Sequence, residues 1–310
     1  MLIKHMKWMA QYKRSYESKE ERQKRFEIFK ENVEYIESFN RDGKHTYTLG
    51  INEFADLIKE EFLSKYARNY KPSSFQSSMS SSFKYENVKH VPLERAKCCY
   101  AHREPRTMRK NICHIYSGSC WAFSAVAAIE GIAKIRSSVL ASLSEQHILD
   151  CNAAAEGCLG GRMEPVYEFV MQNGGLASDT DYPYQTSKGT CRVNVPSSLA
   201  VTITGYERVP PNSETAMLLA VTNQPVSVAI DSSLFQFYQG GVLTGPCGNI
   251  RTHAVTAVGY GTSEDGAKFW LFKNSWVPNW GEEGYVRLQR DIDAIEGMCG
   301  LAADVTYPTA

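Results

Sequence analysis

The sequence lacks an excess of charge of either sign, and it lacks a long apolar run. Lys and Arg together number 34, as do Asp and Glu, so nothing predicts a nucleic-acid partner or another strongly charged partner. No apolar stretch approaches the roughly 20 residues of a membrane-spanning helix, and we expect no membrane association. The N-terminal residues Met1–Lys7 contain no secretory hydrophobic region.

Paired C-x-x-C spacing, which is typical of structural zinc sites, is also missing. We therefore predict neither a metal nor another cofactor. Cysteines scattered through a chain of 310 residues favour an oxidising compartment. We expect delivery to the vacuole or lysosome, or an extracellular location, with a leader that is not visible in this sequence. The nine cysteines are Cys98, Cys99, Cys113, Cys120, Cys151, Cys158, Cys191, Cys247 and Cys299.

The N-terminal part, residues 1–66, is charged and shows helical periodicity. Apolar residues recur there at spacings of three and four, which predicts one buried helix face. Gly43 should end this helix, and Gly50 lies in a more extended stretch. The stripe consists of Phe26, Phe29, Val33 and Ile36.

A serine-rich segment, residues 67–90, separates this unit from the rest and has the composition of an exposed linker and cleavage zone. The larger unit spans residues 91–310. Helical patterns dominate residues 91–200, whereas residues 201–310 are richer in alternating β-formers such as Pro225–Ile230. With 43% hydrophobic residues the chain can bury sizeable cores, and we predict an α+β fold.

Three residues form a candidate catalytic set: Cys120, His253 and Asn274. Cys120 begins a helix-like apolar run, and the positive end of a helix favours the reactive thiolate. His253 lies in a strand-like segment and could exchange the proton of the thiol. Taken singly, Cys120 could be a buried structural thiol and His253 a core histidine, so the argument depends on the combination.

Two further patterns place the chain beside a known family. The segment that begins Cys120-Trp121-Ala122-Phe123-Ser124, together with Asn274-Ser275-Trp276, resembles the catalytic segments of papain-family cysteine proteases. Upstream, residues at fixed offsets resemble the two propeptide motifs of the same family. They are Glu21, Arg25, Phe29, Asn32, Ile36, Asn40, Gly50, Asn52, Phe54 and Asp56.

The resemblance implies a zymogen of a cysteine-type endopeptidase of protein catabolism, close to the plant senescence-associated type. It implies a papain-like fold with a helical lobe and a β-barrel-like lobe, preceded by a helical propeptide that runs through the cleft. Cys120 would be the nucleophile, His253 the proton carrier, Asn274 the residue that orients the imidazole, and Trp276 its shield. Expected partners are protein and peptide substrates, the chain's own propeptide and cystatin-like inhibitors, and the protein should be a monomer.

The resemblance also implies how a substrate is held. Gly160 and Gly161 would hydrogen-bond its backbone. Four residues would line the pocket for the P2 side chain, which belongs to the second substrate residue before the scissile bond. The acid Asp304 at the floor of this pocket could accept a basic P2 side chain. The pocket residues are Met163, Ala229, Ala254 and Asp304.

Disulfides are carried over from the family in the same way. The resemblance implies that Cys151 pairs with Cys191 and that Cys247 pairs with Cys299. Cys158 should remain unpaired, because Ser117 stands at the position of its usual partner, unless Cys113 or another thiol reaches it.

Residues 93–117 depart from the family pattern. His114 stands where the family has a glutamine that donates to the oxyanion. A shift of coding frame across this segment would account for the break, and an inserted loop is the alternative. A second interpretation of the whole chain therefore stays open: a catalytically impaired homologue from a degenerate gene, or a protease inhibitor that acts through its propeptide.

Overall fold

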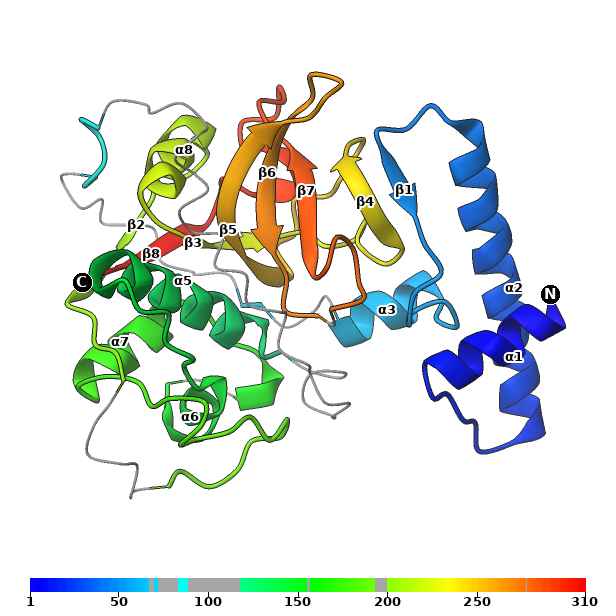
Figure 1. Ribbon diagram of the computed structural model, residues 1–310, viewed down its shortest axis with the longest axis horizontal. Coiled ribbons are helices and arrows are strands. Elements are labelled where there is room, and N and C mark those ends of the chain that lie inside the picture. The colour runs from blue at the N-terminus through cyan, green and yellow to red at the C-terminus, as the bar shows by residue number, and fades with distance from the viewer. Residues whose placement is uncertain (67–69, 72–82, 89–117, 155–156, 193–199, 277) are drawn as a thin grey trace.

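The computed structural model describes residues 1–66, 70–71, 83–88, 118–154, 157–192, 200–276 and 278–310. Over these residues helices and strands are largely segregated (Figure 1), as predicted for an α+β fold. Most of the predicted linker 67–90, and His114 with it, lies outside the described residues.

The N-terminal unit consists of helices that lie beside the main sheet and one short strand that joins its edge (Figure 1). Its long second helix begins where the Ser18 hydroxyl accepts the N–H of Glu21 at 3.0 Å, and it ends at Gly43, whose φ of 63° is left-handed. Phe29 and Val33 of this helix pack against Trp8. The elements are α1 (Leu2–Gln11), α2 (Lys19–Asp42), β1 (Tyr47–Leu49) and α3 (Lys59–Tyr66).

The helical lobe forms around α5 (Cys120–Ser137). Its alanine-rich inner face is buried and lets neighbouring elements approach closely. Ser144 caps the next helix by accepting the N–H of His147 at 2.9 Å. The remaining elements of this lobe are α6 (Glu145–Cys151), the short 3-10 turn η2 (Gly157–Leu159) and α7 (Glu164–Gln172).

The β-rich lobe is an eight-stranded sheet in the order β1-β4-β7-β6-β5-β3-β8-β2. All neighbours are antiparallel except β4 and β7. Strand β1 belongs to the N-terminal unit, so that unit extends the sheet at one edge. The other elements are β2 (Gly205–Arg208), α8 (Glu214–Asn223), β3 (Val226–Ile230), β4 (Tyr238–Leu243), β5 (His253–Thr262), β6 (Lys268–Lys273), β7 (Tyr285–Gln289), η3 (Met298–Gly300) and β8 (Val305–Thr309).

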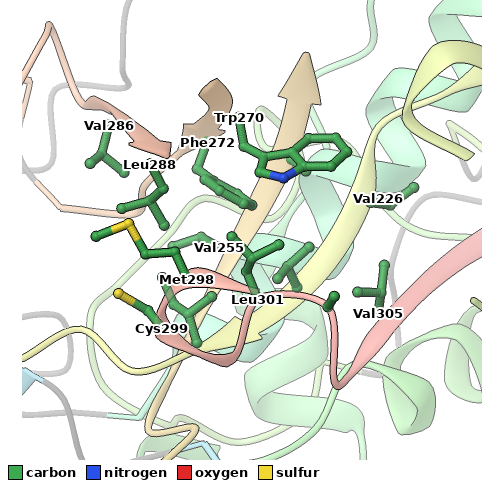
Figure 2. Packing of buried hydrophobic residues seen from close by; sticks show 14 of the residues in the cluster. Val226, Val255, Trp270, Phe272, Val286, Leu288, Met298, Cys299, Leu301 and Val305 are labelled. Atoms are coloured by element: carbon green, nitrogen blue, oxygen red, sulfur yellow. The ribbon is translucent and has the colours of Figure 1, made fainter. Parts of the chain in front are cut away.

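Large apolar side chains from several strands fill the core of this lobe. Figure 2 shows Trp270 and Phe272 of β6 together with Val255 of β5 and Leu301, which follows η3. Each of these side chains is at least 99% buried, and burial of such groups contributes about 1.5–3 kcal/mol apiece. This core fixes the start of β5 and the segment after β6, which carry two of the predicted catalytic residues.

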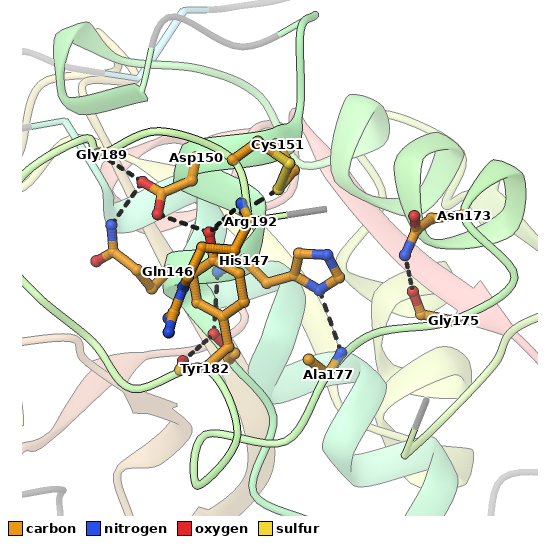
Figure 3. The surroundings of a disulfide bond; sticks show 12 residues. Gln146, His147, Asp150, Cys151, Asn173, Gly175, Ala177, Tyr182, Gly189 and Arg192 are labelled. Atoms are coloured by element: carbon orange, nitrogen blue, oxygen red, sulfur yellow. Dashed lines mark hydrogen bonds between the residues drawn. A yellow bond between two sulfur atoms is a disulfide. The ribbon is translucent and has the colours of Figure 1, made fainter. Parts of the chain in front are cut away.

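Both predicted disulfides are present, and each staples one lobe: Cys151–Cys191 and Cys247–Cys299. Figure 3 shows the surroundings of the first of them. Asp150 there accepts hydrogen bonds from the Tyr182 hydroxyl at 2.9 Å and from the Gly189 N–H at 2.6 Å. The network holds the end of α6 against the loop that carries Cys191.

The prediction that Cys158 is unpaired is wrong, because Cys158 is disulfide-bonded. Among the described cysteines Cys120 is the free one and the other four form the two pairs above, so the partner of Cys158 lies outside the described residues. The position of Ser117 excludes only the usual partner, and the exception that the sequence left open, a bond to Cys113 or another thiol, is consistent with this finding.

Over the residues with described coordinates, no helix has both the length and the apolar character needed to cross a bilayer. In the same residues, no group of three or more His, Cys, Asp or Glu side chains is placed to hold a metal ion.

Candidate active site

Cys120 is the first residue of α5, so its sulfur lies at the positive end of a helix. Burial raises the pKa of the Cys120 thiol to about 11, although backbone hydrogen bonds from Ala254, Trp121 and Cys120 itself act in the opposite direction. The contact with Ala254 joins the start of α5 to the start of β5. In this form of the protein the sulfur is therefore a protonated, buried thiol.

His253 is the first residue of β5 and is 1% exposed. Its Nε2 lies 2.8 Å from the Oδ1 of Asn274, and Nδ1 has no hydrogen-bond partner within the described part of the chain. Burial lowers the pKa of His253 to about 4, and the bond with Asn274 partly offsets this. The imidazole is thus neutral, and a neutral ring that donates from Nε2 leaves Nδ1 as a proton acceptor.

Hydrogen bonds between α5 and β5 hold the two lobes together beside these residues. The Ser124 hydroxyl donates to the Val255 carbonyl at 2.7 Å, and the Thr256 hydroxyl donates to the Ser124 carbonyl at 3.2 Å. All three residues are buried. The start of the helix with Cys120 and the start of the strand with His253 are therefore held at the same junction.

Trp276 covers the bond between His253 and Asn274. Its ring centroid lies 5.2 Å from that of His253, and its side chain is 4% exposed. On its other side, Phe54 and Phe62 of the N-terminal unit pack edge-on, each at 5.4 Å. The N-terminal unit and the predicted site thus share one aromatic cluster.

The predicted glycine rim is occupied by a segment of the N-terminal part. Tyr70 forms a parallel β-bridge with Gly161, the Lys71 N–H donates to the Gly161 carbonyl at 3.2 Å, and the Tyr70 N–H donates to the Thr252 carbonyl at 3.1 Å. A Cβ at Gly161 would lie 2.6 Å from the Trp121 ring, so only glycine fits there. Gly160 has a φ of 112°, which also favours glycine.

The four predicted pocket residues come together around the Tyr70 ring. Tyr70 packs in one buried cluster with Met163, Ala229 and Ala254, and its hydroxyl donates to the Oδ2 of Asp304 at 2.7 Å. Sequence reasoning missed Tyr70, because a lone tyrosine beside a serine-rich stretch carries no motif. Its neighbour Lys71, which reaches the glycine rim, was missed for the same reason.

Residues of the two N-terminal motifs have structural roles. Arg25 of α2 donates to Glu61 of α3 at 2.6 Å and to the Asp56 carbonyl at 2.9 Å. Asn52 donates to the Gln236 carbonyl at 2.7 Å, and Gln236 donates back to the Leu57 carbonyl at 2.9 Å. The motifs therefore hold the unit together and dock it on the sheet next to β4.

Comparisons with known proteins agree with this geometry. The family "Papain family cysteine protease" matches residues 103–309, and "Cathepsin propeptide inhibitor domain (I29)" matches residues 5–62. The senescence-specific cysteine protease SAG39 of Oryza sativa subsp. indica is 46% identical, over 100% of this chain and 91% of that protein. A recombinant stem bromelain precursor is 40% identical with a TM-score of 0.85, over 99% of this chain and 98% of its own.

A bromelain protease from Ananas comosus, solved in complex with the inhibitor E64, is 49% identical with a TM-score of 0.60, over 62% of this chain and 89% of its own. The chain thus has the two-lobe, propeptide-capped architecture of a protease precursor. It belongs to the papain family of cysteine proteases. It is the zymogen of a cysteine endopeptidase, with its own propeptide in the cleft and proteins as substrates. The alternative of a non-catalytic homologue or inhibitor is not favoured.

Proposed function

We propose that Cys120, His253 and Asn274 carry out the hydrolysis and that Trp276 keeps water from the bond between the last two. The observation that carries this assignment is the orientation of His253. Its Nε2 is bound to Asn274 at 2.8 Å, while Nδ1 is left without a described partner beside the helix that begins with Cys120.

In the proposed reaction the sulfur of Cys120 attacks the carbonyl carbon of the scissile bond, and its proton passes to Nδ1 of His253. That proton then goes to the leaving amine as the C–N bond breaks and an acyl-thioester remains. Water, deprotonated by His253, attacks the thioester and restores the thiol. Asn274 accepts from Nε2 and stabilises the charged ring in between.

Titration with the epoxide E-64 after acid activation tests this assignment. We expect one equivalent of inhibitor to be incorporated, with the modification on the peptide that contains Cys120. The Cys120→Ala variant and the unactivated proform serve as controls and should remain unlabelled. Full activation without labelling of Cys120 would contradict the assignment.

We also propose that processing cuts the chain within residues 67–90 and frees a peptidase of residues 91–310, with a helical lobe at about 91–200 and a β-rich lobe at about 201–310. The composition of the segment supports this. Mass spectrometry of the acid-activated protein tests it, and a new N-terminus outside 67–90 would refute it.

Location, inhibitors and oligomeric state complete the proposal. Disulfides in both lobes support a vacuolar, lysosomal or extracellular location, which fractionation of the native tissue would test. After activation, a cystatin-like inhibitor would bind at the glycine rim, which the propeptide occupies in the zymogen. The activated protein would act as a monomer. Inhibition by a cystatin and a monomeric mass in light scattering are the expected results.

A further inference from the structure

Three charged side chains meet behind the pocket that holds Tyr70. Glu164 is the first residue of α7, Arg208 is the last residue of β2, and Asp304 directly precedes β8. Glu164 is 4% and Asp304 6% exposed, whereas the Arg208 side chain is 35% exposed and reaches them from the rim. Of these three residues, only Asp304 is predicted from the sequence to line the pocket.

Arg208 is shared by the two carboxylates. Its Nη2 donates to Oε1 of Glu164, and its Nη1 lies 3.6 Å from Oδ1 of Asp304. The second oxygen of Asp304, Oδ2, accepts the phenol of Tyr70. Asp304 therefore faces a cation on one side and the pocket on the other, and the Ala229 N–H holds its main chain by donating to its carbonyl at 3.1 Å.

The charge of Asp304 is thus partly compensated before any substrate arrives. A guanidinium or ammonium that bound its Oδ2 would lie close to the like charge of Arg208, whereas a phenol brings a hydrogen-bond donor without charge. Burial raises the pKa of Glu164, with Arg208 opposing and Asp304 adding to the effect. Glu164 accordingly takes up a proton more readily than an exposed glutamate, which brings the cluster closer to neutrality in acid.

We propose that Arg208, held by Glu164, is a specificity-determining residue that makes this pocket select an uncharged aromatic P2 side chain ending in a hydroxyl, tyrosine, over arginine or lysine. Tyr70 of the propeptide stands in for that side chain. The inference rests on the proposed function and refines the expectation that the acid at the floor accepts a basic group.

A panel of fluorogenic dipeptides with Arg at P1 and Tyr, Phe or Arg at P2 tests the proposal on the acid-activated enzyme. We expect kcat/KM for the Tyr substrate to exceed that for the Phe substrate several-fold, because only Tyr donates a hydrogen bond to the carboxylate of Asp304. It should exceed that for the Arg substrate by about tenfold or more, because Arg meets the like charge of Arg208. In Arg208→Gln the ratio of Arg to Tyr should rise at least about tenfold.

Two further variants keep the test decisive. Glu164→Gln/Arg208→Gln replaces the ion pair by a neutral pair, so it avoids a buried unpaired carboxylate and should shift the ratio in the same direction. Asp304→Asn should remove most of the preference for Tyr over Phe. Arg136→Gln is the matched control, since Arg136 is exposed in the last turn of α5, and its ratios should stay at the wild-type values.

An activated wild-type enzyme that cleaves the Arg substrate as well as the Tyr substrate would overturn the proposal. An unchanged ratio in both Arg208 variants would do the same. E-64 titration of each variant separates this outcome from a failure of the catalytic assignment, because that failure would leave the enzyme unlabelled regardless of the P2 residue.

Discussion

His5 should make the propeptide unit unstable in acid. The ring is fully buried, and within the described residues neither ring nitrogen has a hydrogen-bond partner. Aromatic rings surround it, with Phe29 at 4.9 Å and Phe26 at 5.3 Å between centroids. Burial lowers the pKa of His5, while the nearby charge of Asp56 raises it and that of Arg22 lowers it.

The sign of the effect follows from this lowered pKa. The folded unit disfavours the charged ring, so the stability contributed by neutral His5 is fully present above the ordinary pKa of 6.5 and is lost as the pH falls below it. The loss grows as the pH falls further below 6.5, until the buried ring itself takes up a proton.

The perturbation is His5→Phe, which keeps the aromatic volume and removes the proton site. Hydrogen exchange of α1 and α2 at pH 4.5 and 7, in full-length protein that carries Cys120→Ala to prevent self-cleavage, measures the local stability. Protection factors should fall from pH 7 to pH 4.5 in the parent protein. We expect this fall to be at least tenfold smaller in His5→Phe. The exposed His45, changed to Phe, is the control, and equal acid sensitivity in all three proteins would refute the reasoning.

Three further predictions concern the sheet edge, the imidazole and the thiol. Gly241→Ala would place a Cβ 2.4 Å from the Thr46 carbonyl oxygen of the propeptide, so processing at neutral pH should accelerate about tenfold. Gly245→Ala, which shares the positive φ but has open space around its Cβ, should not accelerate processing, and equal rates in the two variants would contradict the steric argument. Asn274→Ala removes the hydrogen bond that raises the pKa of His253, so kcat/KM should fall about tenfold to hundredfold. The acid limb of the pH profile of kcat/KM should move to lower pH, and an unchanged acid limb would contradict this role of Asn274. Burial raises the pKa of Cys120 to about 11, so iodoacetamide at pH 7 should alkylate the proform about a hundredfold more slowly than the activated enzyme. Similar alkylation rates would show that the cleft of the proform is open.

The sequence was sufficient to predict the features that depend on local chemistry or on fixed spacing. The helix that ends at Gly43 follows from periodicity and from a residue that tolerates a positive φ. Cys120, His253 and Asn274 were predicted from residue chemistry together with the resemblance. The structure brings Nε2 of His253 to 2.8 Å from Oδ1 of Asn274, and the catalytic role of the set stays a prediction. The disulfide between Cys151 and Cys191 was likewise implied by the resemblance.

What could not be predicted depends on contacts between distant segments. Tyr70 meets Asp304 across more than two hundred residues, and no local pattern of a lone tyrosine indicates that. Arg208 and Glu164 lie on a strand and a helix that each look ordinary alone. The bond of Cys158 could not be predicted because Ser117 stands at the position of its usual partner and no local pattern selects another cysteine.

Inhibition and catalysis in this zymogen use the same aromatic surface. Trp276 packs on His253 from one side and on Phe54 and Phe62 of the propeptide from the other, so departure of the propeptide exposes the indole that covers the catalytic hydrogen bond. Burial both raises the pKa of Cys120 and lowers that of His253, which keeps the pair neutral. Rehydration of the cleft relieves both effects at once, so the pKa of Cys120 falls and that of His253 rises. Both changes reduce the free-energy cost of moving the proton from sulfur to imidazole. We therefore expect release of the propeptide to favour the reactive ion pair as well as to open the cleft to substrate.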